Sequence, residues 1–279
     1  MPFPPLVVAC FLFISSGLLP AFAQDRLLTG VVQARDTQLP LSYVNIGIRG
    51  KNTGTVADEH GVFSLRVPAA RAGDTLTFSA VGYQEQSFPI ARLEAAQLQP
   101  LLLTQKAIAL AEVVVRGRPE KVRRIGTITH NPLLWGNFTS KNTHDINEFA
   151  KLIPLANIPS QLVQAHIFLR RPTVDTVAFR LNFYRVSQGL PAERVVEQTI
   201  LVRTAVQNGW LTIDLTKYAL TLQADFYLGF EFLPEKQGAV PAFSYGAQFG
   251  GAALVRTSSL GTWKREPGAS LTAYVTVKQ

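Results

Sequence analysis

The chain has 279 residues, of which 47% are hydrophobic and 16% charged, and its formal net charge is +8. This apolar content is too high, and this charge too low, for a disordered protein. At roughly 150 residues per domain, the length allows one large domain or two small ones.

Residues 1–23 have the features of a secretory signal peptide. They carry no charged side chain, an apolar run covers residues 6–19, and Ala-Phe-Ala at 21–23 provides a small-x-small cleavage site. The run is shorter than the roughly 20 residues of a membrane span. We therefore predict an exported protein, located in the periplasm or at the outer membrane or cell surface. Acylation of Cys10 is the alternative, but the preceding Val-Val-Ala is a poor lipoprotein motif.

Cleavage would also remove Cys10, which is the single cysteine. The mature chain would then form no disulfide, no cysteine-ligated zinc site and no thiol nucleophile. Residues 24–118 carry 10 basic and 8 acidic side chains, and residues 119–279 carry 17 and 11, so the second half holds most of the charge. Five basic residues lie within 116–124, and Pro119 among them suggests a linker. No aromatic side chain interrupts this stretch to stack on bases, so we predict no nucleic-acid binding.

Residues 24–118 alternate apolar and polar side chains with the period of β-strands. Turn signals separate the short strands, as in a small antiparallel sandwich. Asp58 and Gly61 form a predicted structural turn, because the carboxylate can accept from the backbone and glycine permits positive φ. Phe63 would then enter the core, and residues 110–115 would form the last strand.

Five segments of this half, taken together in their order, carry a family resemblance. They are Leu-Thr-Gly-Val-Val (28–32), Pro-Leu-Ser-Tyr-Val-Asn-Ile (40–46), Gly-Thr-Val-Ala-Asp-Glu-His-Gly-Val-Phe (54–63), Gly-Asp-Thr-Leu-Thr-Phe-Ser-Ala-Val-Gly-Tyr (73–83) and Leu-Ala-Glu-Val-Val-Val (110–115). The order resembles the carboxypeptidase-like regulatory domain of exported Bacteroidetes proteins. This resemblance implies a seven-stranded transthyretin-like or prealbumin-like sandwich over residues 24–118, without catalytic chemistry. Ala57 departs from the family pattern, which usually has threonine there.

Zinc peptidase and serine hydrolase chemistry are not supported by the motifs. The zinc carboxypeptidase signature is His-x-x-Glu, and none of the four histidines has glutamate at the third following position. Gly-x-Ser-x-Gly and phosphate-binding glycine loops are also absent from the sequence. We therefore predict no catalytic residues, no metal and no cofactor. The alternative of metal binding by His144 and Glu148 is disfavoured, because Asp145-Ile-Asn-Glu148 is typical of a helix capping box.

Residues 119–164 are predicted to be a basic linker and an irregular segment with one short helix, which Pro154 would end. Residues 165–279 return to alternation, with strands predicted around 177–184, 210–215, 226–232 and 271–277. These strands predict an all-β, jelly-roll-like antiparallel sandwich. This half also resembles, less specifically, an uncharacterised C-terminal domain that accompanies regulatory modules in Bacteroidetes proteins.

The polar rows of these strands are predicted to face solvent and to bind a ligand. Aromatic rings beside amide and charged groups suit sugars, which offer C–H faces and hydroxyl groups. The candidate ligand-binding residues are Arg180, Asn182, Tyr184, Tyr227, Glu231 and Trp210. The alternative is that Arg180 and Glu231 form a simple cross-strand pair.

The sequence thus predicts a non-enzymatic, two-module cell-envelope protein that binds a glycan or an outer-membrane partner. The alternative is a glycan-active hydrolase with two carboxylates in the second sandwich, about 5–9.5 Å apart.

Overall fold

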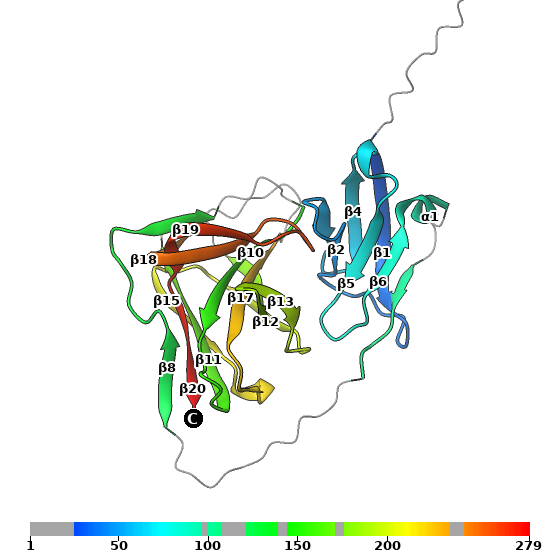
Figure 1. The fold of residues 1–279 in the computed structure, drawn as a ribbon. Helices are drawn as coiled ribbons and strands as arrows, with labels where there is room; N and C mark the ends of the chain where they lie inside the picture. The colour runs from blue at the N-terminus through cyan, green and yellow to red at the C-terminus, as the bar shows by residue number, and fades with distance from the viewer. Residues whose placement is uncertain (1–24, 96–99, 108–120, 139–143, 171–175, 235–242) are drawn as a thin grey trace, which may run out of the picture.

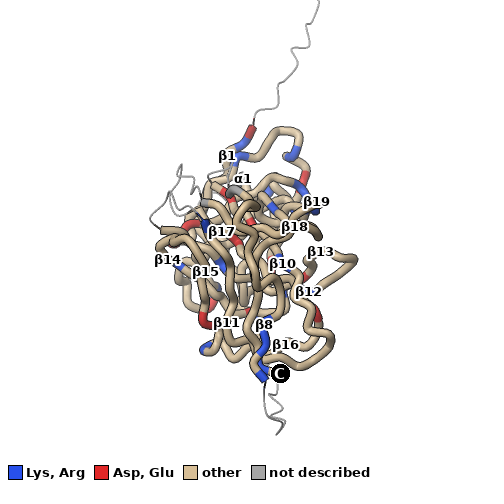
Figure 2. Tube along the Cα trace, turned by 90° about the vertical axis from the view of Figure 1, so that its left-hand side faces the viewer, with Lys and Arg blue, Asp and Glu red and all other residues tan. Residues whose placement is uncertain are grey.

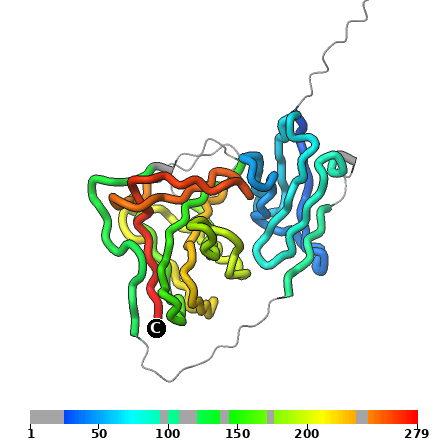
Figure 3. Tube along the Cα trace, in the orientation of Figure 1, coloured from blue at the N-terminus to red at the C-terminus, as the bar shows by residue number. Residues whose placement is uncertain are grey.

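The structure, a computed structural model, describes residues 25–95, 100–107, 121–138, 144–170, 176–234 and 243–279. The predicted signal peptide and the predicted strand at 110–115 lie outside these residues. The chain forms two β-sandwiches that lie side by side (Figures 1 and 3), which confirms the predicted all-β fold. Within the described ranges, no helix has the length and apolar character needed to cross a membrane.

The N-terminal sandwich consists of two small sheets, with strand orders β4-β1-β7 and β3-β2-β5-β6. Its elements are β1 (Arg26–Ala34), β2 (Asn45–Gly47), β3 (Gly54–Val56), β4 (Val62–Val67), a 3-10 turn (Ala69–Arg71), β5 (Thr75–Ser79), β6 (Gln86–Pro89), α1 (Ile90–Ala95) and β7 (Leu101–Leu103). β1 is antiparallel to β4 and parallel to β7. The described part of this domain contains seven strands, and the strand predicted at 110–115 lies outside it.

The turn between β3 and β4 forms as predicted. The Oδ1 atom of Asp58 accepts hydrogen bonds from two backbone N–H groups of the turn, both at 2.9 Å. Gly61 has φ +75°, which side chains rarely adopt. The turn delivers Phe63 into the core, where its ring meets that of Phe78 edge-on at 5.6 Å.

The C-terminal sandwich comprises β8 to β20, and the pairings found among its described strands are antiparallel. The strands are β8 (Val122–Gly126), β9 (Trp135–Phe138), β10 (Asn147–Ile153), β11 (Ser160–Arg170), β12 (Val177–Ser187), β13 (Leu190–Arg194), β14 (Ile200–Thr204), β15 (Gly209–Asp214), β16 (Thr221–Leu222), β17 (Phe226–Leu233), β18 (Phe243–Arg256), β19 (Lys264–Leu271) and β20 (Ala273–Lys278), and a 3-10 turn spans Thr216–Tyr218. Hydrogen bonds connect them in the order β13-β12-β17-β10-β18-β11-β20-β8. β14 pairs with β12, β15 and β16 pair with β11, and β9 and β19 pair with β18.

The long strand β18 joins the two layers of this sandwich. Its first residues pair with β9 and β11, whereas its later residues pair with β10 and β19. Gly250 and Gly251, at φ +87° and +71°, form a bulge between Phe249 and Ala252, which shifts the register with β19. The layers enclose one apolar core, whose largest fully buried side chains include Phe179, Phe183, Phe226 and Phe230.

The prediction of an irregular segment with a helix at 119–164 is wrong, because β8, β9, β10 and the start of β11 lie there. The expected capped helix is β10, which pairs with β17 along its whole length. Phe149 and Ile153 are four residues apart, an even spacing that places both on one face of a strand as well as of a helix. Its seven residue pairs with β17 show that this segment is a strand. The described end of the basic stretch is β8, whose exposed arginines are blue in Figure 2.

Candidate functional site

Four charged side chains form a row across neighbouring strands β12, β17, β10 and β18. The cross-strand register places Arg180 opposite Glu231, Glu231 opposite Glu148, and Glu148 opposite Arg256. All four are buried, and both carboxylates are fully inaccessible to solvent. We call these residues the charged row. Its order, plus-minus-minus-plus, gives each carboxylate its own guanidinium.

The carboxylate of Glu231 has every oxygen occupied. Its Oε2 accepts from Arg180 Nε and Asn182 Nδ2, both at 2.7 Å, and its Oε1 accepts from Asn45 Nδ2 at 2.6 Å. Burial acts to raise the Glu231 pKa, but the ion pair and hydrogen bond with Arg180 overcome it, so the pKa lies well below its usual value. The group therefore stays ionised across the physiological range.

The carboxylate of Glu148 is held in the same way. Its Oε1 accepts from Asn182 Nδ2 at 2.9 Å and from the Tyr184 hydroxyl at 2.8 Å, and its Oε2 accepts from Arg256. Burial, followed by the charge of Glu148, raises the Tyr184 pKa, so this phenol remains a proton donor. Gly229 leaves the necessary space, since a Cβ there would lie 2.5 Å from Glu148 Oε1.

The N-terminal sandwich covers one end of the charged row. Asn45, fully buried on β2, accepts from Arg180 Nη2 at 2.7 Å, in addition to donating to Glu231. Arg180 Nη1 donates to the Tyr43 carbonyl at 2.9 Å. Arg194 Nη1 also reaches Ser79 Oγ at 3.4 Å. The polar face of the second sandwich is therefore an interface between the two domains.

A second contact between the domains centres on Asp145. Its carboxylate accepts from Ser258 Oγ at 2.7 Å and from the Ser259 backbone at 3.0 Å, which fixes the loop after β18. That loop lies against Gly47 and Gly54, where a Cβ would approach the Ser259 carbonyl oxygen to 2.3 and 2.8 Å. Burial raises the pKa of Asp145 to about 6, although its hydrogen bonds act in the opposite direction.

The prediction that the polar rows of β12 and β17 face solvent is wrong. Arg180, Asn182, Tyr184, Tyr227 and Glu231 are all buried. The domain interface covers the row near its β12 end, and the β18 side is closed by packing against Arg256. The guanidinium of Arg256 lies 4.8 Å from the Trp263 ring. Alternation along a strand identifies two faces, but it cannot distinguish solvent from a second domain.

Four of the predicted residues share the hydrogen bonds of this cluster, Tyr227 packs beside Tyr184 without joining them, and Trp210 lies elsewhere. Tyr227 lies opposite Tyr184 in the register, but its hydroxyl donates to the Gly189 carbonyl at 2.7 Å. Trp210 lies on β15 in the other layer of the sandwich. Asn45, Glu148 and Arg256 were missed as partners, because they come from distant parts of the chain or from a segment that resembles a helix cap.

An aromatic cluster surrounds Trp210 on the outer face of β11, β15 and β20. Trp210 meets Phe168 edge-on at 5.4 Å and Tyr274 at 4.9 Å. His130, from the loop before β9, stacks on Phe168 at 4.1 Å, and His166 stacks on Tyr274 at the same distance. Because Tyr274 and His166 are buried, the half-buried Phe168 and Trp210 and the exposed His130 form the accessible part.

Trp135 on β9 extends this cluster. It is 43% exposed, and the Arg170 guanidinium lies 4.6 Å from its ring. Trp135 pairs with Gly246, where a Cβ would come within 3.0 Å of the Phe168 ring, so this glycine makes room for the row. We call Trp135, Phe168, Trp210, Tyr274, His130 and His166 the aromatic face.

His166 is the buried titratable group of the aromatic face. Its ring nitrogens lie 3.0 Å from Thr212 Oγ1 and 2.9 Å from Thr276 Oγ1. Burial, with a smaller contribution from Arg124, lowers its pKa to about 4, so the ring is neutral at physiological pH. Across the described ranges, no group of three or more His, Cys, Asp or Glu side chains could hold a metal ion.

Residues 28–115 match the family model of the CarboxypepD_reg-like domain, and the N-terminal sandwich is a domain of this family. A curated relative is the TonB-dependent receptor SusC of Bacteroides thetaiotaomicron, with 37% identity over 112 residues. The match covers 40% of this chain and 10% of SusC, so the chain spans about a tenth of that relative's length.

Two solved structures of infectious bursal disease virus, from the Gt and Gx strains, align with 91% of the chain. The alignments cover 59% and 63% of those chains, at 9% and 12% identity, with TM-scores of 0.26 and 0.27. These scores are too low to indicate a shared fold.

Proposed function

We propose that the protein is a non-enzymatic, exported cell-envelope protein that takes part in glycan uptake at the outer membrane. The observation that carries this proposal is the CarboxypepD_reg-like domain, which a TonB-dependent receptor also possesses. Here the domain is joined through buried hydrogen bonds to a second sandwich that presents the aromatic face. We propose that this face binds the glycan.

The chemistry of the aromatic face supports sugar binding. Indole rings stack on the C–H faces of pyranose rings, and neighbouring polar groups bond their hydroxyls. Trp135 and Trp210 supply indole surface on β9 and β15, and Arg170 and the exposed Thr212 supply hydrogen-bonding groups nearby. The rings are held by mutual edge and stacking contacts, so little side-chain entropy would be lost on binding.

The state of the carboxylates favours binding over hydrolysis. A glycosidase needs two carboxyl groups that flank the substrate, one of them protonated. Glu148 and Glu231 do face each other, but both are inaccessible to solvent and paired with arginine. Their geometry supports a structural role in the domain interface.

A glycan array probed with the full chain, followed by calorimetry on the best glycan, tests the proposal. We expect Trp135→Ala and Trp210→Ala each to weaken binding roughly tenfold, a loss of about 1.4 kcal/mol. Phe249→Ala is the matched control, because this aromatic residue is 69% exposed and lies at the β18 bulge. Absence of glycan binding, or equal losses in all three variants, would overturn the glycan assignment. Release of reducing sugar by the wild-type protein would overturn the non-enzymatic assignment.

A further inference from the structure

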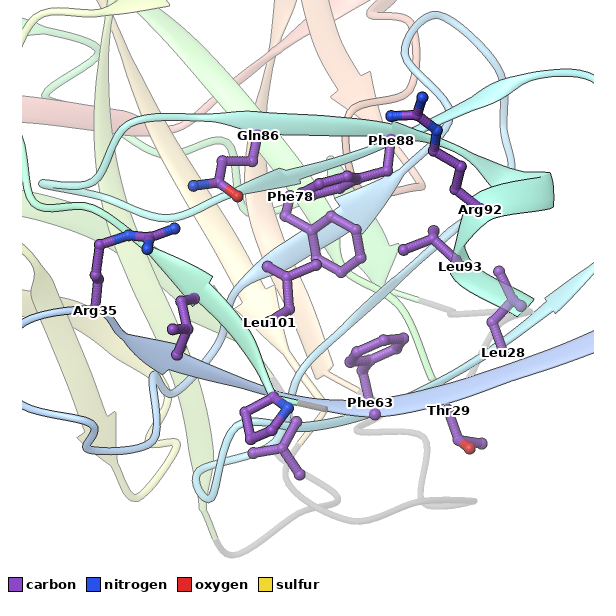
Figure 4. Close-up of a pocket in the computed structure, with 14 residues that line it drawn as sticks. Leu28, Thr29, Arg35, Phe63, Phe78, Gln86, Phe88, Arg92, Leu93 and Leu101 are labelled. Atoms are coloured by element: carbon purple, nitrogen blue, oxygen red, sulfur yellow. The ribbon is translucent and has the colours of Figure 1, made fainter. Parts of the chain in front are cut away.

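The N-terminal sandwich contains an apolar cavity of about 570 Å³ between its two sheets (Figure 4). This volume is within the roughly 300–1,000 Å³ typical of small-molecule sites. The rings of Phe63, Phe78 and Phe88 and the side chains of Leu93 and Leu101 project into it. The cavity lies within one domain, far along the chain from the aromatic face, and has no part in the glycan proposal.

The cavity lies beside the start of β7, where Pro100, Leu101 and Leu102 line it. Pro100 precedes this strand and has no N–H to donate to a neighbouring strand. β7 consequently pairs with β1 only at residues 32–34, so in the described part of the chain the first half of β1 has no partner on that side. Gly30 adds space at this point, since a Cβ would lie 2.9 Å from the Phe63 ring. Leu93 of α1 also lines the cavity.

Two guanidinium groups accompany this apolar interior. Arg35 and Arg92 are exposed residues that line the cavity, from the end of β1 and from α1, and Gln86 lies between them in sequence on β6. Arg35 Nε donates to Thr104 Oγ1 at 3.2 Å. Within the described residues, no carboxylate lies at ion-pair distance from either arginine. Among the described residues, the cavity therefore combines an apolar interior with two guanidinium groups at its edge that form no ion pair.

We propose that this cavity binds an anionic amphiphile, with a long alkyl chain among the phenylalanines and a carboxylate at Arg35 or Arg92. Burying an alkyl chain against these rings removes its apolar surface from water, which is favourable. A guanidinium is suited to a carboxylate, with which it forms charge-assisted hydrogen bonds. A sugar does not fit this site, because the cavity walls offer few partners for its hydroxyl groups.

Palmitate is the probe, measured by calorimetry on the full chain below its micelle concentration, with hexadecanol as the uncharged partner of equal chain length. We expect the wild-type protein to bind palmitate. The double variant Arg35→Ala/Arg92→Ala should bind palmitate roughly tenfold more weakly, while its affinity for hexadecanol should change little. Arg66→Ala is the control, because Arg66 is also an exposed arginine of this domain but does not line the cavity. Leu101→Trp, which adds bulk inside the cavity, should reduce the binding of both probes.

A second arm distinguishes a free fatty acid from the acyl chain of a membrane lipid. Phosphatidylglycerol vesicles are sedimented with the wild-type protein and with Leu101→Trp, whose folding is checked by circular dichroism. If the wild-type protein sediments with the vesicles and Leu101→Trp does not, the ligand is the acyl chain of a membrane lipid. If the protein binds palmitate but does not sediment, the ligand is a free fatty acid. Palmitate binding that is absent, or unchanged in both the arginine variant and Leu101→Trp, overturns the proposal. Neither result bears on the aromatic face, so this test fails or succeeds separately from the glycan test.

Discussion

Replacement of Asn45 by alanine should destabilise the C-terminal sandwich, although Asn45 belongs to the other domain. The change removes the donor to Glu231 Oε1 at 2.6 Å and the acceptor from Arg180 Nη2 at 2.7 Å. Hydrogen bonds to charged groups contribute about 1.5–3 kcal/mol each, so the two together predict a loss of about 3–6 kcal/mol. The loss is large because both charged partners stay buried without a substitute.

Tryptophan fluorescence during urea unfolding measures this loss of stability in the C-terminal sandwich. The three tryptophans, Trp135, Trp210 and Trp263, all belong to the C-terminal sandwich. A change at Asn45 can alter their unfolding transition only through the domain interface. We expect a lower midpoint, and a free energy of unfolding reduced by at least about 3 kcal/mol.

Thr77→Ala is the control for general damage to the N-terminal sandwich. Thr77 is also buried, but its hydroxyl pairs with Ser87 Oγ at 2.9 Å inside that domain. A double-mutant cycle of Asn45→Ala with Glu231→Gln should give a coupling energy of about 1 kcal/mol or more. The reasoning is refuted if Asn45→Ala lowers the free energy by less than about 1 kcal/mol, or by no more than Thr77→Ala.

Two further predictions concern the pH dependence of the interface and the packing of the charged row. The folded-state pKa of Asp145 is raised to about 6, so its contribution to stability is complete below the unfolded value of 3.8 and falls as the pH rises through 6. Chemical unfolding at pH 5 and at pH 8 should therefore show that the free energy of unfolding of the wild type falls by about 1 kcal/mol more than that of Asp145→Asn. Parallel pH profiles of the two proteins would contradict this. Gly229→Ala should cost about 1–3 kcal/mol, because its Cβ would collide with Glu148 Oε1. Gly73→Ala is the control, because a Cβ there meets nothing within 4 Å, and it should leave the melting temperature nearly unchanged. If both variants lower the melting temperature equally, the close contact between Gly229 and Glu148 is not the cause.

The charged row accounts for how the two sandwiches are held together. A buried ion pair is weak evidence for stability, because desolvation offsets the attraction between the charges. Its geometry is nevertheless specific, since Asn45 must reach Glu231 and Arg180 at the same time. We infer that the row fixes the orientation of one domain on the other, with the apolar contact of Tyr43 and Val56 against Ala178 supplying burial.

Much of the fold could be predicted from local patterns. Alternation identified β12, β15, β17 and β20, because period two is a property of the strand itself. The turn at Asp58 and Gly61 was also predictable, since its hydrogen bonds lie within four residues. β10 could not be predicted, because apolar residues four positions apart fit both a strand and a helix. Only its pairing with β17 shows that the segment is a strand.

The sequence by itself therefore determined the all-β class, the regulatory-type N-terminal domain and the positions of those strands whose alternation is clear, such as β12, β15, β17 and β20. The tertiary structure alone decided what the polar faces contact. Arg180, Glu231 and Glu148 look like solvent-facing or capping residues in sequence, but they are buried because strands far apart in the chain and a second domain converge on them. Aromatic residues gather on the opposite layer for the same reason, since cross-strand neighbours are set by register and not by sequence distance.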